Sequence, residues 1–328
     1  AQFEPLLRAP LEGWAAEATI QSMLTYATQR RAHLRNVLPT ALSAVPGLPV
    51  TNGYATTTNN VVTITGRAHA AETRSVLLNG QPISWTAWRS EWSAPAVPLN
   101  PGLNRLWIES LDEQGLVFDS LAVDIFRTPA TNTTVTATIA TNPTWTLAGG
   151  PYEILTPISV ESAATLTIEP GVTVFFAPGA YLTVQGRLLA LGDPYARIQM
   201  TPPPGSGPWG GLILQNTTHE NRILHVDFRN SSSGNQSLHV IASRVWIEGC
   251  TWTGTGETIL ELTSASAVIR GNVFPSVVDN ETIHGFGGIL PGGEMVIEGN
   301  VFGTTTGYSD VIDFTGGQRP GPILQVLG

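Results

Sequence analysis

The segments Val268-Ile-Arg-Gly-Asn-Val-Phe274 and Val296-Ile-Glu-Gly-Asn-Val-Phe302 differ at a single residue, and they decide the fold of the second half of this chain. Similar strand-and-turn segments are His225-Val-Asp-Phe-Arg-Asn230, Val245-Trp-Ile-Glu-Gly-Cys-Thr-Trp252 and Leu324-Gln-Val-Leu-Gly328. One apolar residue of each segment is taken as equivalent: Val226, Ile247, Ile269, Ile297 and Val326. Successive residues of this series are 21, 22, 28 and 29 positions apart. Helical solenoids have longer units with 3.6-residue periodicity, which is absent here. The spacing predicts stacked coils of three short strands and three turns.

Stacking predicts that equivalent apolar residues form columns inside a tube, because no coil buries its interior alone. Asn272 and Asn300 are expected to form a side-chain amide ladder, and Phe274 and Phe302 to stack one coil apart. Five-residue alternating segments punctuated by Gly or Pro-Gly extend the pattern back through residues 164–192. The sequence therefore predicts a right-handed parallel β-helix over residues 144–328.

Three other regions precede the predicted β-helix. Residues 17–38 have apolar residues at helical spacing, so residues 1–50 are predicted to be a helical segment. Residues 55–128 read as a small β-sandwich, because short strand-like runs are separated by turns such as Asn79-Gly80 and Pro101-Gly102. Residues 129–143 are Thr-rich and are predicted to be a linker. The predicted fold class is all-β, with one short N-terminal helix.

Composition excludes several kinds of function. The chain has 328 residues, a net charge of −9 and only 12% charged residues, and all its positive side chains are Arg. The absence of Lys excludes Schiff-base chemistry, and the negative charge argues against nucleic acid as a partner. No apolar run is long enough to span a bilayer. The single cysteine allows no intrachain disulfide and no zinc cluster.

Several segments resemble known families. Thr165-Leu-Thr-Ile-Glu-Pro-Gly-Val-Thr-Val-Phe175, Trp209-Gly-Gly-Leu-Ile213 and the repeated Ile-X-Gly-Asn-Val-Phe resemble secreted bacterial right-handed parallel β-helix proteins. Leu77-Leu-Asn-Gly80, Trp92 and Leu99-Asn-Pro-Gly-Leu-Asn-Arg-Leu106 resemble bacterial immunoglobulin-like modules, which usually act as spacers. Residues 1–45 resemble the tail of a CotH kinase-like surface protein. These resemblances imply an extracellular or cell-surface location and leave the activity open, because β-helices carry lyases, hydrolases, adhesins and passive stalks.

The same alignment predicts one column of charged side chains. The residues after the aligned apolar positions are expected to point outward along one sheet, about 5 Å apart: Asp227, Glu248, Arg270, Glu298 and Leu327. Adjacent carboxylates at that spacing would suit a retaining glycosidase or a calcium site. The alternative is a solvated column in which Arg270 neutralises Glu248 and Glu298.

Other candidate sites have weaker signals. Residues 275–294 and 303–322 are interpreted as long insertions that overhang the same side, where calcium is the candidate ion for Asp279, Glu281, Asp310 and Asp313, with His284 nearby. Trp85, Trp88 and Trp92 are candidates for a sugar-stacking platform or for core positions. His219 and Glu220 beside Asn221 form a candidate acid–base pair, and Cys250 is expected in the core.

Two functions follow from these patterns. The favoured one is a non-catalytic structural, adhesive or assembly segment of a larger secreted or cell-surface bacterial protein. The alternative is a polysaccharide-active enzyme, either a lyase or a glycoside hydrolase, or a carbohydrate-binding module. Expected partners are a cell-surface polysaccharide and further copies of the chain, joined as a homo-oligomer or filament through the uncapped end at Leu327 and Gly328.

Overall fold

The computed structural model describes residues 5, 8–37, 41–231, 236–254, 258–307, 310–316 and 324–327, without the side chains of residues 34–37. The chain divides into two compact units. One unit consists of Ala1–Gly47, Val61–Val97 and Leu106–Val123, and the other of Leu48–Asn60, Pro98–Arg105 and Asp124–Gly328. No helix among the described residues is both long and apolar enough to cross a membrane.

The predicted N-terminal helix is confirmed as α2, Glu17–Val37, while Leu38 lies outside the described residues. Two largely antiparallel sheets follow it in sequence. Their strand orders are β1-β4-β8-β7 and β2-β3-β10-β9-β5-β6. The strands are β1 (Ser43–Val45), β2 (Val50–Thr51), β3 (Tyr54–Thr57), β4 (Val61–Arg67), β5 (Ser75–Leu78), β6 (Gln81–Pro82), β7 (Ser84–Thr86), β8 (Glu91–Pro98), β9 (Gly102–Leu111) and β10 (Val117–Arg127).

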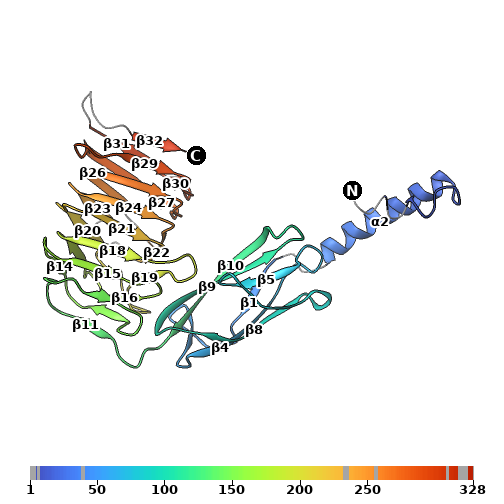
Figure 1. The fold of residues 1–328 in the computed structure, drawn as a ribbon, viewed down its shortest axis with the longest axis horizontal. Helices are drawn as coiled ribbons and strands as arrows, with labels where there is room; N and C mark the ends of the chain where they lie inside the picture. The colour runs from blue at the N-terminus through green and yellow to red at the C-terminus, as the bar shows by residue number, and fades with distance from the viewer. Residues whose placement is uncertain are drawn as a thin grey trace. The chain divides into compact units, whose positions relative to one another are not determined.

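The rest of the chain forms the predicted parallel β-helix, whose strands lie one above another in Figure 1. The coils contribute strands in turn to three parallel sheets, here called sheets I, II and III, and among the described residues the last strand of sheet II is β25. Sheets I and III are joined because β26 (Leu260–Arg270) runs through both, with a register shift between Thr263 and Ala265. The predicted linker contains β11 (Thr133–Val135), which pairs with β13 and so belongs to the β-helix.

The strand bounds of the three sheets are as follows. Besides β26, sheet I contains β12 (Thr144–Trp145), β15 (Thr165–Ile168), β18 (Arg187–Leu191), β21 (Glu220–Leu224), β24 (Arg244–Glu248), β29 (Met295–Glu298) and β32 (Leu324–Leu327). Sheet II contains β11, β13 (Tyr152–Ile154), β16 (Thr173–Phe176), β19 (Ile198–Thr201), β22 (Val226–Arg229) and β25 (Thr251–Thr253). Besides β26, sheet III contains β14 (Ile158–Val160), β17 (Leu182–Val184), β20 (Leu212–Gln215), β23 (Leu238–Ile241), β28 (Ile283–Ile289) and β31 (Ile312–Phe314).

The register confirms most of the predicted alignment. Ile247 pairs with Ile269, Ile269 with Ile297, and Ile297 with Val326. The equivalence of Val226 to Ile247 was wrong, because Ile223 occupies that position in sheet I. Val226 belongs instead to β22 of sheet II, after the turn. The turn at His225 separates the two strands, and each strand has its own inward apolar residue, so Ile223 and Val226 both offer an apolar residue to align with Ile247.

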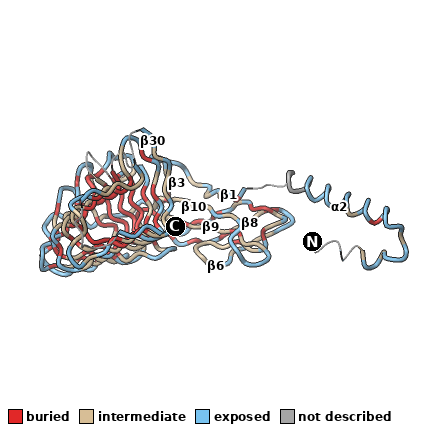
Figure 2. The backbone as a smooth tube through the Cα atoms, turned by 90° about the horizontal axis from the view of Figure 1, so that it is seen from above, coloured by how far each residue is buried: buried red, intermediate tan, exposed pale blue. Residues whose placement is uncertain are grey.

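The β-helix interior is a continuous core of buried side chains. The backbone of buried residues is red in Figure 2 and is concentrated in this part of the chain. The predicted amide ladder is confirmed, with Asn272 Nδ2 donating to Asn300 Oδ1 at 2.9 Å. The predicted stacking of Phe274 on Phe302 is also confirmed, with ring centroids 5.2 Å apart. It is the last step of a longer aromatic column, Phe176, Trp209, Phe228, Trp252, Phe274 and Phe302.

The interpretation of residues 275–294 and 303–322 as insertions needs correction. Residues 283–289 are β28 and residues 312–314 are β31, which are regular coil strands of sheet III. In the turns before these strands, β27 (Val277–Val278) pairs with β30 (Thr305–Thr306) and forms a separate two-stranded sheet. Residues 308–309 and 317–323 lie outside the described residues.

Candidate functional site

The most extensively bonded charged residue of the β-helix is Asp227, in the middle of β22. Its side chain is on the outer face of sheet II, in a column with Gln199 and Thr251. That face is covered within the same compact unit, so Asp227 is only 1% exposed. Asp227 Oδ1 accepts a hydrogen bond from Arg197 Nε at 2.7 Å, and Oδ2 accepts one from Gln199 Nε2 at 2.7 Å. The hydroxyl of Thr251 donates to Oδ1 at 2.5 Å.

Two further arginines and one further carboxylate complete the cluster. Arg105 Nη1 lies 3.4 Å from Asp227 Oδ2, and its Nε and Nη2 donate to the two oxygens of Asp124 at 3.0 and 3.2 Å. Arg229 donates from Nε to Gln199 Oε1 at 3.2 Å, and its Nη2 lies 2.9 Å from Asp124 Oδ2. All of these residues belong to one compact unit. We call Arg105, Asp124, Arg197, Gln199, Asp227, Arg229 and Thr251 the Asp227 cluster.

Electrostatics keep Asp227 ionised. Burial alone would raise the pKa of its carboxyl, but Arg105, Arg197 and Arg229 outweigh burial and hold the pKa below its ordinary value. Burial also acts to lower the pKa of the Arg105 guanidinium, and Asp227 and Asp124 outweigh it, so that this pKa is raised. A carboxylate held in this way neither gives nor takes a proton near neutral pH, so its chemistry is that of a structural counter-ion.

The prediction that Asp227 lies beside Glu248 in one exposed column was wrong. Asp227 belongs to sheet II, and the residue paired with Glu248 at that position is Leu224. The rest of the column is confirmed, because Glu248 pairs with Arg270 and Arg270 with Glu298. Arg270 binds Glu298, with Nη2 and Nε 2.6 and 2.7 Å from Oε2. The retaining-glycosidase pair proposed for Asp227 and Glu248 is therefore absent.

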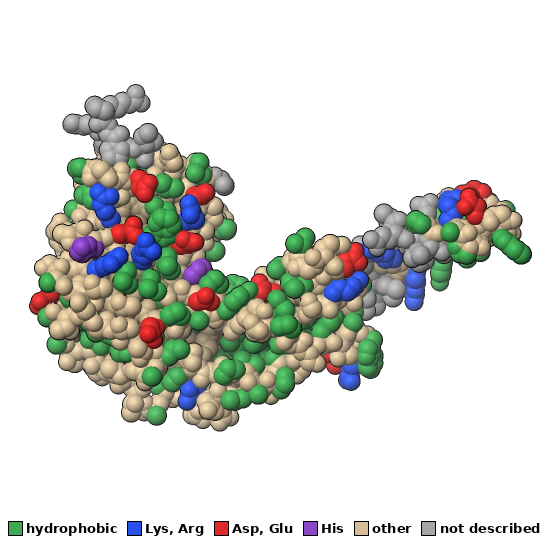
Figure 3. All heavy atoms as spheres, in the orientation of Figure 1, with side chains coloured by type: hydrophobic (Ala, Val, Ile, Leu, Met, Phe, Trp, Pro, Cys, Tyr) green, Lys and Arg blue, Asp and Glu red, His purple; other side chains and the backbone are tan. Residues whose placement is uncertain are grey.

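A tryptophan lies among these charged groups on the outer face of sheet I. Trp246 is half-buried, and its Nε1 donates to Glu248 Oε2 at 2.7 Å. The guanidinium of Arg270 lies over its ring, 5.5 Å from the centroid. Glu248 and Glu298 are two strand spacings apart, about 9–10 Å between backbones, whereas a retaining pair needs about 5–5.5 Å. Figure 3 shows acidic and basic side chains interspersed on the β-helix face in view.

Sequence reasoning missed His225, which stands at the turn between β21 and β22. Its backbone is left-handed, with φ of 48°, and the following coils have Gly249, Gly271 and Gly299 at this position with φ of 62°, 59° and 59°. Burial and Arg197 lower the pKa of the His225 imidazole, and Glu248 and Asp193 act in the opposite direction. The signal that would have found it is a histidine at the glycine position of the Ile-X-Gly repeat. The three-residue error in alignment concealed it.

The three tryptophans of the predicted sugar platform do not form one surface. Trp92 is 2% exposed and pairs directly with the half-buried Trp85, so both side chains lie on the core side of their strands. Trp88 is 84% exposed on the one-turn helix η1, Ala87–Arg89, with Arg89 over its ring. Of these three tryptophans, only Trp88 is therefore available as an exposed stacking surface.

The structure places His219 and Glu220, the candidate acid–base pair, at the start of β21. Glu220 is the first residue of β21, and its Oε1 accepts a hydrogen bond from Arg222 Nε at 2.9 Å. Asn221 is fully buried and bonds the backbone of two neighbouring coils. It accepts from Leu188 N at 2.8 Å and donates to Arg244 O at 3.0 Å. Asn221 is therefore a structural residue, like Asn272.

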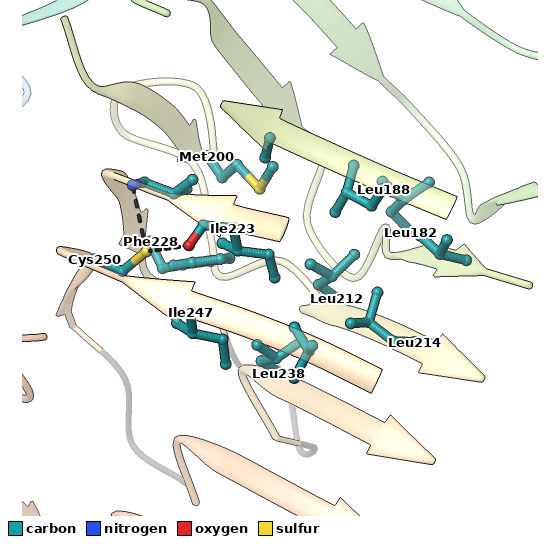
Figure 4. Packing of buried hydrophobic residues seen from close by; sticks show 14 of the residues in the cluster. Leu182, Leu188, Met200, Leu212, Leu214, Ile223, Phe228, Leu238, Ile247 and Cys250 are labelled. Carbon is teal, nitrogen blue, oxygen red and sulfur yellow. Dashed lines mark hydrogen bonds between the residues drawn. The ribbon is translucent and has the colours of Figure 1, made fainter. Parts of the chain in front are cut away.

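Cys250 is confirmed as a core residue at the ladder position that Asn272 and Asn300 occupy in later coils. Figure 4 shows it beside Ile223 and Phe228, with Sγ 3.5 Å from Val226 N and 3.3 Å from Ile223 O. Burial raises the pKa of the thiol to about 12. The sulfur therefore replaces the asparagine side chain as a hydrogen-bonding group and is not an activated nucleophile.

The residues predicted to hold calcium are spread over several turns and strands. Asp313 pairs with His284 across β31 and β28, while Glu281 Oε2 accepts a long hydrogen bond from Thr258 at 3.4 Å. Asp310 lies just before β31, and Asp279 has left-handed backbone with φ of 54°. Across the described part of the chain, no three His, Cys, Asp or Glu residues are grouped so that they could hold a metal ion.

Comparison with known proteins adds little. We found no match to a protein-family model and none to a curated protein sequence. Among solved structures, a family 28 exopolygalacturonase from Yersinia enterocolitica aligns with the chain at 8% identity and a TM-score of 0.24. The alignment covers 88% of this chain and 80% of that one. A likeness at this level carries no argument about activity.

Proposed function

We propose that this chain is a non-catalytic structural and adhesive segment of a larger secreted or cell-surface protein. In this proposal the β-helix is a stiff stalk and the N-terminal sheets are an immunoglobulin-like spacer. The observation that carries it is the state of Asp227, the candidate acid with the most strongly perturbed surroundings. Its carboxylate oxygens form ion pairs with three guanidinium groups and accept hydrogen bonds from two neutral side chains. In this proposal Asp227 therefore stabilises the fold.

A depolymerisation screen tests the non-catalytic part of this proposal. The purified chain is incubated with acidic and neutral polysaccharides, and new reducing ends and unsaturated products are measured. We expect no turnover above buffer, because Glu298 is paired with Arg270 and Glu248 is bonded to Trp246. Turnover that disappears in Glu248→Gln and persists in Glu220→Gln would establish the enzyme alternative in place of the stalk.

The outer face of sheet I is the second candidate, as a polysaccharide-binding surface. Trp246 offers an aromatic face, and Glu248 and Arg270 beside it offer an acceptor and donors for sugar hydroxyls. Affinity electrophoresis in gels that contain polysaccharide measures such binding. Trp246→Ala is expected to weaken it about fivefold, the size of one aromatic contact, while Trp88→Ala leaves it unchanged. If Trp88→Ala weakens binding and Trp246→Ala leaves it unchanged, the polysaccharide binds to the N-terminal sheets. If the chain is retarded equally in gels with and without polysaccharide, neither surface binds it.

A further inference from the structure

A pocket opens beside the Asp227 cluster, and all of its lining residues belong to one compact unit. Its volume is about 490 Å³, within the range of about 300–1,000 Å³ that holds small molecules. The polar side chains that line it come from the β2–β3 turn, from β10, from the turn after β19 and from the end of β22. They are Asn52, Tyr54, Asp124, Thr201, Ser206, Arg229 and Asn230, of which Thr201 is the last residue of β19.

The walls of the pocket are braced by hydrogen bonds. Asn52 Nδ2 donates to Pro204 O at 3.1 Å, which connects the two turns across the pocket. The turn itself is closed by Ser206 N, which donates to Pro203 O at 2.9 Å. Gly205 has φ of 85°, and a Cβ at this position would lie 2.8 Å from Asn52 Nδ2. A glycine is therefore required where the two turns meet, and the pocket has a preformed shape.

The charge of the adjoining cluster is unbalanced. Its ion pairs join three arginines to two aspartates: Arg105, Arg197 and Arg229 to Asp124 and Asp227. No other carboxylate of the described residues lies within ion-pair distance of these guanidinium groups. One positive charge is thus left uncompensated in a largely buried setting, which is unfavourable without a counter-ion.

Arg229 is the arginine of the cluster that lines the pocket. The residue is 7% exposed, and its Nη2 lies 2.9 Å from Asp124 Oδ2 and 4.0 Å from Asp227 Oδ2. Both oxygens of Asp124 also accept hydrogen bonds from Arg105, so the two guanidinium groups share this one carboxylate. The pocket is the space that Arg229 lines. An oxyanion placed there would supply the negative charge that Asp124 and Asp227 alone do not provide for the three arginines.

We propose that this pocket binds a small oxyanion, either a carboxylate such as that of an acidic sugar or an inorganic phosphate-type group. Arg229 supplies the charge, and Tyr54, Asn52 and Ser206 supply neutral hydrogen-bonding groups around it. The inference does not depend on the structural and adhesive role proposed above, because its residues are separate from Trp246 and Glu248.

Isothermal titration of the full chain with three probes tests the proposal: inorganic phosphate, glucuronate and the matched neutral sugar glucose. We expect phosphate or glucuronate to bind with a Kd of about 1 mM or tighter, and glucose to bind at least about tenfold more weakly. The stronger of the two anions identifies the source of the oxyanion. Equal binding of glucose and glucuronate, or no anion binding at 10 mM, would overturn the proposal.

A matched pair of variants tests the location without disturbing the buried cluster. Ser206 is exposed at the pocket, so Ser206→Asp adds a negative charge there and Ser206→Asn adds the same bulk without charge. We expect the anion affinity to fall about tenfold or more in Ser206→Asp and by less than about threefold in Ser206→Asn. Thermal unfolding of both variants checks that they are folded. Equal affinities in the two folded variants would place the anion elsewhere and refute the site.

Discussion

Asn272 donates from its side-chain Nδ2 to the side-chain Oδ1 of Asn300, the equivalent residue one coil further, at 2.9 Å. Asn300 Oδ1 also accepts from the backbone N–H of Asn272, and Asn300 Nδ2 donates to Ile269 O at 2.8 Å. Each asparagine therefore satisfies backbone groups at a turn where the strand ladders are interrupted. This explains why the Ile-X-Gly-Asn segment recurs, since a buried turn needs a side chain to replace missing backbone partners.

Asn272→Ala is expected to destabilise the β-helix by about 2–4 kcal/mol, because it leaves the Cys250 N–H and the Ile247 carbonyl without their partners in the interior. Urea unfolding followed by circular dichroism measures the change. Gln185→Ala, at an exposed turn, is the control and should change stability by less than about 0.5 kcal/mol. Equal midpoints for the two variants would show that the ladder contributes no net stability.

Asp227→Asn should cost about 3–5 kcal/mol, because three buried guanidinium groups lose a common counter-charge. Glu298→Gln is the matched control, since it breaks an ion pair with Arg270 that is largely exposed. Its expected cost is about 0–1 kcal/mol. Chemical denaturation of both variants gives the comparison. If Asp227→Asn lowers the free energy of unfolding by less than Glu298→Gln does, the Asp227 cluster does not stabilise the fold.

Low pH should reduce the stability of the folded protein through the carboxyl group of Asp227. The pKa of Asp227 in the folded protein is lowered from its ordinary value of 3.8, so below that value the unfolded chain binds more protons than the folded one. The stabilisation is present above the ordinary value and is lost as pH falls through the folded pKa. The stability difference between the native chain and Asp227→Asn should therefore narrow below pH 4. A difference that is constant from pH 7 to pH 3 would contradict this assignment.

A double-mutant cycle tests the turn formed by His225 and Gly249. A Cβ on Gly249 would collide with the imidazole of His225, and Gly249 itself has φ of 62°. Gly249→Ala is expected to cost more than about 1 kcal/mol, and clearly less in the His225→Gly background, where only the backbone strain remains. His225→Gly alone should be neutral or mildly stabilising, because glycine adopts φ of 48° freely. Strict additivity in urea unfolding would show that the two residues do not interact.

Cys250 should be chemically silent in the folded protein. Its thiol is fully buried and has a pKa of about 12, so almost no thiolate exists at neutral pH. A thiol-specific chromogenic reagent is expected to react with the folded chain only as it unfolds, and to titrate one thiol per chain in urea. Stoichiometric labelling within seconds in native buffer would mean that the core around Cys250 opens readily.

The sequence alone was sufficient for the fold of the second half of the chain. Ile247, Ile269 and Ile297 recur at coil spacing and pair in register, and Asn272, Asn300, Phe274 and Phe302 stack as their repetition predicts. These features follow from sequence because each coil is sheltered by its neighbours, so every coil repeats the same local requirements. The helix at residues 17–37 was likewise apparent from apolar spacing.

Only the tertiary structure decided where Asp227 lies and what surrounds it. Arg105 pairs with it, and Asp124 pairs with Arg105 and Arg229. Both precede Asp227 by more than 100 residues, and no local pattern connects them. Each strand of a coil also has its own inward apolar residue, which is why Val226 was aligned with Ile247 in place of Ile223. Repetition along the chain predicts what neighbouring coils share. A buried charge cluster depends on which distant segments cover one particular face, and that is a property of the folded chain.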